Sequence, residues 1–168
     1  MYDRVLLATD GGPGTDEAVR QALSIAARYG ASLDVLYVAT AGSLPLDAHS
    51  QTVLAEFENA GRESLDEVVD LARERGLDAR GVVERGVPHR MILSHADAND
   101  CDVVVMSKHG EAGLRALRAG IRRPVLGSVT ARVLRSSDVP VLVVPPRRRP
   151  SADAPTSRAD GNVTGPDI

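Results

Sequence analysis

The chain has 168 residues, of which 43% are hydrophobic and 26% are charged, and its formal net charge is −3. This length and apolar content predict one soluble domain with its own core, and the acidic balance gives no reason to expect a nucleic-acid partner. A single cysteine, Cys101, excludes an internal disulfide, and no apolar run approaches the ~18 residues of a membrane span, so we expect a cytoplasmic protein without a membrane partner.

Short apolar runs alternate with amphipathic segments along most of the chain. Each apolar run predicts a buried strand, and each segment with apolar residues at helical spacing predicts a helix. This alternation is typical of an α/β domain, in which helices cover both faces of an open parallel sheet. The predicted strands are Arg4–Thr9, Leu33–Val38, Arg80–Glu84, Asp102–Met106 and Pro140–Val144.

The helices are expected between these strands. Thr15 or Asp16 can cap the first helix, and Gly30 stops it. The stretch from Leu44 to Gln51 has no clear period and is predicted to be a loop. The other predicted helices are one from about Val53 to Arg75, a short one after Gly86-Val87-Pro88, and one from about Val129 to Arg135.

The composition changes near residue 145. The last residues are rich in Pro, Ser, Asp and Arg and contain almost no large apolar side chain. Such a segment cannot offset the entropy lost on ordering. We therefore predict one folded domain over residues 1–145 and a disordered tail over residues 146–168.

Candidate ligand contacts follow the predicted strands. In an open parallel sheet, ligands bind at the carboxyl ends of the strands. Thr9 and Asp10 end the first strand, and the stretch from Ser107 to Gly110 follows the fourth. Gly127 and Ser128 precede the last helix, whose first N–H groups form a ready site for phosphate oxygens. Turn formation alone also explains both glycines, but their placement favours a phosphate site.

The motifs of several enzyme classes are absent from the sequence. There is no GxxxxGK[ST], GxGxxG, HExxH or GxSxG pattern, so we expect no catalytic machinery. Cys101 begins a predicted strand and is expected to be a buried structural thiol. His95 lies among apolar helix positions and is expected to be a satisfied, partly buried histidine. Asp10 can bind a ribose or cap its own loop, and His109 can meet a ligand or be a plain loop residue.

Several stretches together resemble the universal stress protein family. They are VLLATDGG at the start, LDVLYV, Gly86-Val87-Pro88, DVVVM followed by HG, and LGSVTARVLRSSDVPVLVV near the end. The resemblance covers about Tyr2 to Val144. It implies a five-stranded parallel sheet of order 3-2-1-4-5, a Rossmann-like fold of the adenine nucleotide alpha hydrolase type. It also implies a homodimer formed by the last strands, Val141 to Val144, and two branches, of which one binds ATP.

The pattern of the ATP-binding branch, G-x2-G-x9-G-[ST], fits this chain with two departures. Ser107 replaces the first glycine, and the spacer from Glu111 to Leu126 has 16 residues instead of nine. The seven extra residues can loop outward at small entropic cost. By position, the resemblance implies these nucleotide contacts: Ala8, Thr9, Asp10, Val38, Met106, Ser107, Gly110, Gly127, Ser128 and Val129.

Two functions therefore remain open. The first is a dimeric stress-response regulator or switch that binds ATP, with Mg, or a related adenine nucleotide. The alternative is a member of the family that does not bind nucleotides and works as a dimerising protein-interaction module. An enzyme of the wider nucleotide-binding α/β group would need catalytic motifs that this sequence lacks.

Overall fold

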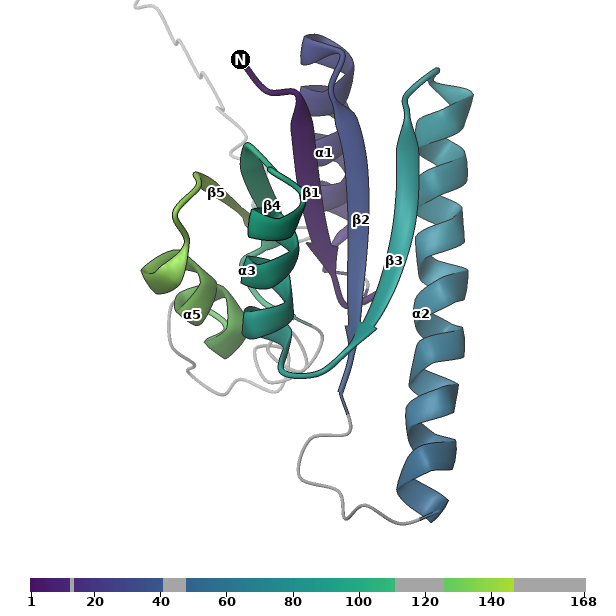
Figure 1. Ribbon diagram of the computed structural model, residues 1–168. Helices are drawn as coiled ribbons and strands as arrows, with labels where there is room; N and C mark the ends of the chain where they lie inside the picture. Colours follow the sequence, from purple (N-terminus) through teal and green to yellow (C-terminus); the bar gives the residue numbers. More distant parts are fainter. Residues whose placement is uncertain (13, 41–47, 111–125, 147–168) are drawn as a thin grey trace, which may run out of the picture.

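The computed structural model describes residues 1–12, 14–40, 48–110 and 126–146 (Figure 1). The predicted disordered tail lies outside the described residues from position 147 onward, as does most of the long spacer, positions 111–125. The boundaries of the described elements are β1 Arg4–Thr9, α1 Asp16–Tyr29, β2 Ser32–Ala39, α2 Ala48–Glu74, β3 Ala79–Arg85, α3 Pro88–Ala98, β4 Val103–Ser107, α5 Ser128–Ser136 and β5 Val141–Val144.

The five strands form one parallel sheet in the order β3-β2-β1-β4-β5, so the predicted fold class and strand order are confirmed. β1 and β4 lie in the interior of the sheet, and every residue of β4 is buried. Continuous apolar runs such as these are typical of parallel strands that are covered on both faces. The chain order reverses between β1 and β4, where a parallel sheet opens a crevice for ligands.

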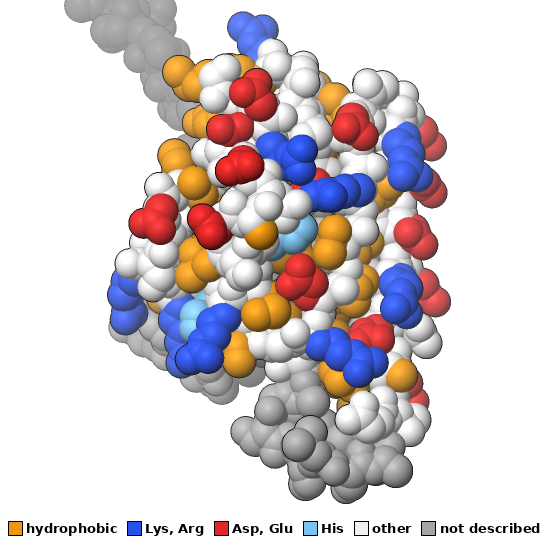
Figure 2. Space-filling model, viewed as in Figure 1, with side chains coloured by type: hydrophobic (Ala, Val, Ile, Leu, Met, Phe, Trp, Pro, Cys, Tyr) orange, Lys and Arg blue, Asp and Glu red, His pale blue; other side chains and the backbone are white. Residues whose placement is uncertain are grey.

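Two apolar layers separate the sheet from its helices. One layer joins α1 and α2 to one face, with Val5, Leu7 and Leu33 among its fully buried side chains. The other joins α3 and α5 to the opposite face, and it includes Leu6 and Leu36. Figure 1 shows α3 and α5 in front of the sheet, with α1 behind it and α2 beside β3. On the front face, basic, acidic and apolar side chains are interspersed (Figure 2).

The start of one helix and the cap of another differ from the predictions. α2 begins at Ala48 instead of Val53, so Ala48–Gln51, predicted to be loop, is helical. The first turns of α2 extend beyond the ends of the strands (Figure 1). Because these turns cover no part of the sheet, their sequence shows no apolar period. Thr15 is the N-cap of α1, but its hydroxyl donates to the Gly12 carbonyl at 2.7 Å and makes no capping hydrogen bond.

The connection from β3 to α3 places the first turn of α3 at the ligand edge. Gly86 has a φ of 148°, a conformation that favours glycine, and its N–H donates to the Ala39 carbonyl at 3.2 Å. Pro88 occupies the first turn of α3, where its fixed φ suits the helix. No described helix is long and apolar enough to cross a membrane.

Candidate functional site

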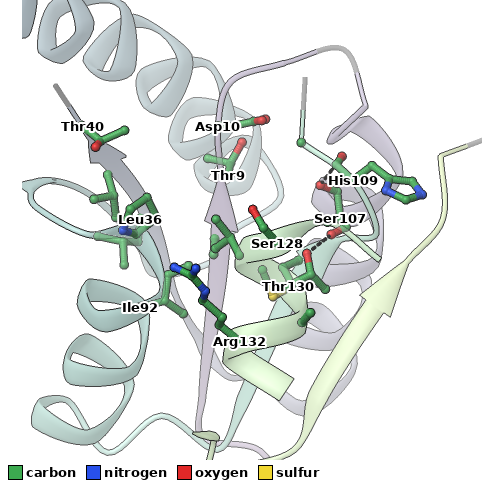
Figure 3. Close-up of a pocket in the computed structure, with 18 of the residues that line it drawn as sticks. Thr9, Asp10, Leu36, Thr40, Ile92, Ser107, His109, Ser128, Thr130 and Arg132 are labelled. Atoms are coloured by element: carbon green, nitrogen blue, oxygen red, sulfur yellow. Dashed lines mark hydrogen bonds between the residues drawn. The ribbon is translucent and has the colours of Figure 1, made fainter. Parts of the chain in front are cut away.

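A cavity of about 980 Å³ lies at the carboxyl ends of β1, β2 and β4, beside the first turns of α3 and α5. Its walls come from segments that are far apart in the sequence (Figure 3). All ten residues named above as nucleotide contacts line it: Ala8, Thr9, Asp10, Val38, Met106, Ser107, Gly110, Gly127, Ser128 and Val129.

One end of the cavity is apolar. Leu36 and Val38 come from β2, Ala8 from β1 and Met106 from β4, and Ile92 comes from the second turn of α3. These residues also belong to, or pack against, the apolar layer under α3 and α5, which fixes their positions. Such a surface can accept a flat, largely apolar group.

The other end contains the N-terminus of α5. Gly127 is the N-cap in an extended conformation, and no described side chain caps the helix. The first intrahelical hydrogen bond runs from the Ala131 N–H to the Gly127 carbonyl at 2.9 Å. The N–H groups of Ser128, Val129 and Thr130 precede that bond, where a helix has no internal acceptor for them. All three residues line the cavity, so the positive end of the helix faces it.

The loop after β4 is tied to α5 and β5. The Ser107 hydroxyl donates to the His109 carbonyl at 3.0 Å, and Thr130 Oγ1 donates to the Ser107 carbonyl at 3.1 Å (Figure 3). The Lys108 N–H donates to the Val144 carbonyl at 2.8 Å. Ser107 has no positive φ, so a side chain at this position causes no left-handed strain. The conformation of position 107 in this chain therefore does not require a glycine.

Gly110 allows a close approach to Asp10. A Cβ at position 110 would lie 2.6 Å from Asp10 Oδ2. The other carboxylate oxygen, Oδ1, accepts a hydrogen bond from the Gly12 N–H at 3.1 Å. Asp10 thus caps its own loop, as one of the two predicted roles requires, and its carboxylate still lines the cavity.

Two arginines of the cavity were not predicted. Ser128, Arg132 and Arg135 are spaced i, i+4 and i+7 on α5, and all three line the cavity. Figure 3 shows the Arg132 side chain reaching from α5 toward the side where Leu36 and Ile92 lie. Neither arginine has an ion-pair partner within the described part of the chain. The helical spacing from Ser128 was the signal in the sequence that could have identified both.

His109 lines the cavity and is 7% exposed. Burial, and then the charge of Lys108, lower the pKa of His109 below its ordinary value. The imidazole is therefore neutral at pH 7.

Phe57, the single phenylalanine, also lines the cavity from α2 and is 43% exposed.

No group of three or more His, Cys, Asp or Glu side chains suited to a metal ion occurs among the described residues. Cys101 is buried, as predicted, and burial raises the pKa of its thiol to about 11. The thiol is therefore protonated at neutral pH and a poor nucleophile.

Comparisons with known proteins agree on one family. The model of the universal stress protein family matches residues 1–145. A universal stress protein of Methanocaldococcus jannaschii is 30% identical over 147 residues, which cover 86% of this chain and 82% of that protein. The solved structure of a second protein of that archaeon has a TM-score of 0.75 at 21% identity and covers 89% of this chain and 99% of its own.

A further solved structure is that of a universal stress protein in complex with cAMP. It has a TM-score of 0.61 at 26% identity, and the match covers 87% of this chain and 98% of the other.

Proposed function

Because the chain belongs to the universal stress protein family, we propose that it binds an adenine nucleotide, ATP in the first place, in the cavity at the strand ends. In this proposal the protein works as a dimeric stress-response regulator or switch. The base lies against Leu36 and Val38, and the phosphates lie at Gly110 and the N-terminus of α5.

The observation that carries the proposal is the composition of this one cavity. One end is an apolar wall, and the other contains the N-terminus of α5, which no side chain in the described part of the chain caps. Arg132 and Arg135, about one and two turns further along the same helix, add two positive charges to the cavity, and Arg132 reaches toward its apolar side (Figure 3). A nucleotide has the matching order of groups, since an apolar ring is joined through a ribose to a chain of anionic phosphates.

The relative that was solved with cAMP supports the class of ligand, because cAMP carries the same base. The preference for ATP rests on this chain's own residues. Two arginines and a helix N-terminus favour a ligand with several negative charges over one with a single charge.

Magnesium would enter this site with the phosphates. Mg²⁺ is commonly bound through one or two carboxylates together with the phosphates of a substrate. Asp10 is the cavity's one carboxylate among the described lining residues, and its Oδ2 faces Gly110. The site therefore fits a metal that arrives with its nucleotide.

We propose binding in place of turnover. The Asp10 carboxylate already accepts a hydrogen bond from its own loop, and the buried His109 has a lowered pKa. A carboxylate that already accepts a hydrogen bond and an imidazole with a lowered pKa are weak general bases. Hydrolysis of ATP, if a partner protein elicits it, is expected to be slow.

The dimer belongs to the same proposal. β5 is an edge strand, and Leu142 in it is 37% exposed. An edge strand with an exposed apolar side chain supports pairing with a second copy through Val141–Val144.

Val143→Asp is expected to give a monomer, because a charge would be buried in the interface. Sedimentation velocity measures this, and a dimeric Val143→Asp protein would place the interface elsewhere.

The nucleotide site is tested by Gly127→Val. The branched side chain enters the space proposed for the phosphates, so we expect at least a hundredfold loss of ATP affinity in equilibrium dialysis. Gly127→Ala is the matched control for folding, because its Cβ meets protein atoms only at ordinary distances of 3.4 Å or more. Unchanged affinity in folded Gly127→Val protein would show that the phosphates bind elsewhere.

A further inference from the structure

A group of polar side chains lies beside the cavity, between α3 and the strands β2 and β3, and two of them are buried. At its centre, Asp34 is 2% exposed and His95 is 6% exposed. Arg80 donates two hydrogen bonds to the Asp34 carboxylate, from Nε to Oδ1 and from a terminal nitrogen to Oδ2, each 2.7 Å long. Asn99 joins the group by accepting from Arg80 at 2.7 Å and donating to the His95 carbonyl at 2.9 Å. We call these residues, together with Glu84, the ionic network.

Both ring nitrogens of His95 face a carboxylate. Nε2 lies 2.9 Å from Asp34 Oδ2, and Nδ1 lies 3.4 Å from Glu84 Oε1. A neutral imidazole donates from one nitrogen only and would turn a lone pair toward one of these carboxylates. Only the doubly protonated ring satisfies both contacts. The hydrogen bond to Asp34 accordingly raises the pKa of His95, against the opposing effect of burial.

The charges around His95 balance when its ring is protonated. Asp34 faces it from β2, and Glu84 and Arg80 belong to the strand beside β2. The carboxylates of Asp34 and Glu84 are then matched by the cations of Arg80 and His95. Loss of the His95 proton leaves excess negative charge in a buried place, which is costly.

The other titratable or charged groups near His95 do not supply the positive charge that balances Asp34 and Glu84. Burial, and then the negative charge of Asp34, keep the Cys101 thiol protonated by raising its pKa. The charged residues of α5 that line the cavity, Arg132 and Arg135, form no ion pair with Asp34 or Glu84. On α3 itself, the polar end of the network is closed by Asn99, which is neutral.

The ionic network adjoins the apolar wall of the cavity. Asp34, Leu36 and Val38 alternate along β2 and therefore point to the same face of the sheet. Glu84 of β3 is the direct strand neighbour of Val38. On α3, His95 follows Ile92 by three residues, about one turn. The contacts of His95 thus join α3 to β2, which both contribute side chains to that wall, and to β3, which lies beside β2.

We propose that His95 is a positioning residue for the nucleotide site. In its doubly protonated form it holds α3 against β2 and β3 and so fixes the wall against which the base lies. Nucleotide binding is therefore coupled to proton binding at His95. This inference rests on the proposed function, since it concerns the same cavity.

The test compares the full-length protein with His95→Gln. Glutamine can still form hydrogen bonds but cannot take up the proton. ATP affinity is measured for both proteins between pH 6 and pH 9, and the ratio of the two affinities is taken at each pH. Titration of ATP itself and of His109 cancels in this ratio. We expect the wild type to bind about fivefold more tightly at low pH, a coupling of ordinary size, and the ratio to approach one as the pH rises through the pKa of His95.

A control variant and a second measurement complete the design. His89→Gln, in the same helix but outside the cavity lining, is expected to follow the wild-type profile. In the wild type, the ring protons of His95 are followed by NMR with and without saturating ATP, which does not depend on the variant folding. Linkage is reciprocal, so the pKa of His95 is expected to be higher in the complex.

The outcomes separate the two claims. ATP binding with a constant affinity ratio, or a His95 pKa that ATP leaves unchanged, would overturn the positioning role alone. Absence of nucleotide binding to the folded wild type at every pH would overturn the proposed function, and the positioning role with it.

Discussion

Arginines are used in opposite ways on the two sides of the cavity wall. Arg132 and Arg135 line the cavity and have no ion-pair partner among the described residues. Arg80, on the same face of the sheet, donates to both Asp34 oxygens and to Asn99. Charges that are already satisfied stabilise or position a fold, whereas charges left open at a cavity are available to a ligand. The ionic network and the cavity therefore differ in what their mutation should change.

The largest expected effect is on stability. Asp34→Ala leaves the buried His95 without its carboxylate, and breaking such a buried pair costs about 3 kcal/mol of the free energy of unfolding. The half-exposed Arg80 adds little to this cost, because water screens its charge. Urea denaturation measures this. Asp70→Asn is the matched control, because Asp70 is exposed and its pair with Arg73 is worth less than about 1 kcal/mol. A loss of similar size in both variants would remove the distinction between the ionic network and an ordinary surface pair.

Arg132→Gln is expected to change ATP affinity and to leave the stability of the fold unchanged. The folded protein should keep its stability, because Arg132 is exposed and pairs with no described carboxylate. ATP affinity should fall about tenfold at low salt, with a smaller loss for AMP, since the guanidinium acts on the ligand's charge. Calorimetric titration at two salt concentrations measures both losses. Arg28→Gln, at the end of α1, is the control for the change in net charge. Equal losses for ATP, AMP and adenosine would exclude an electrostatic role.

A smaller change in the free energy of unfolding is expected when the pH is varied. The pKa of His95 is raised in the folded state, so its contribution is fully present below the pKa of an unfolded histidine and is lost as the pH rises through the folded value. Burial alone would raise the pKa of Asp34, but the hydrogen bonds and charges of Arg80 and His95 together hold it well below its usual range. The contribution of Asp34 is therefore lost only in strong acid. Denaturation from pH 6 to pH 9 should show a decline in the wild type that His95→Gln lacks; parallel curves would contradict a charged His95.

The sheet could be predicted from local sequence because each strand is a short apolar run between turn residues. All predicted strand ends agree with the structure to within one or two residues. The predicted start of α2 was wrong because the first turns of this helix extend past the sheet and show no apolar period. A helix turn that packs against no other element needs no apolar residues, so its sequence does not reveal where the helix begins.

The cavity could be predicted in part. Its glycines and strand-end residues stand in a family pattern, and all ten named contacts line it. Arg132 and Arg135 were missed because a helix face becomes a cavity wall only once the helix is placed. The ionic network was missed for a related reason. Asp34 stands in an apolar strand, but its pairing with Arg80 and His95 depends on strand register and on where α3 lies. Neither can be obtained from one segment alone.

Calorimetric titration of the purified, folded chain with Mg-ATP, with AMP for comparison, tests the central claim most directly. We predict saturable binding that favours ATP, because the N-terminus of α5, which no described side chain caps, and two arginines without a described ion-pair partner line the same cavity. Absence of heat with both nucleotides would contradict a nucleotide site, and it would favour the alternative of a dimerising module that binds other proteins.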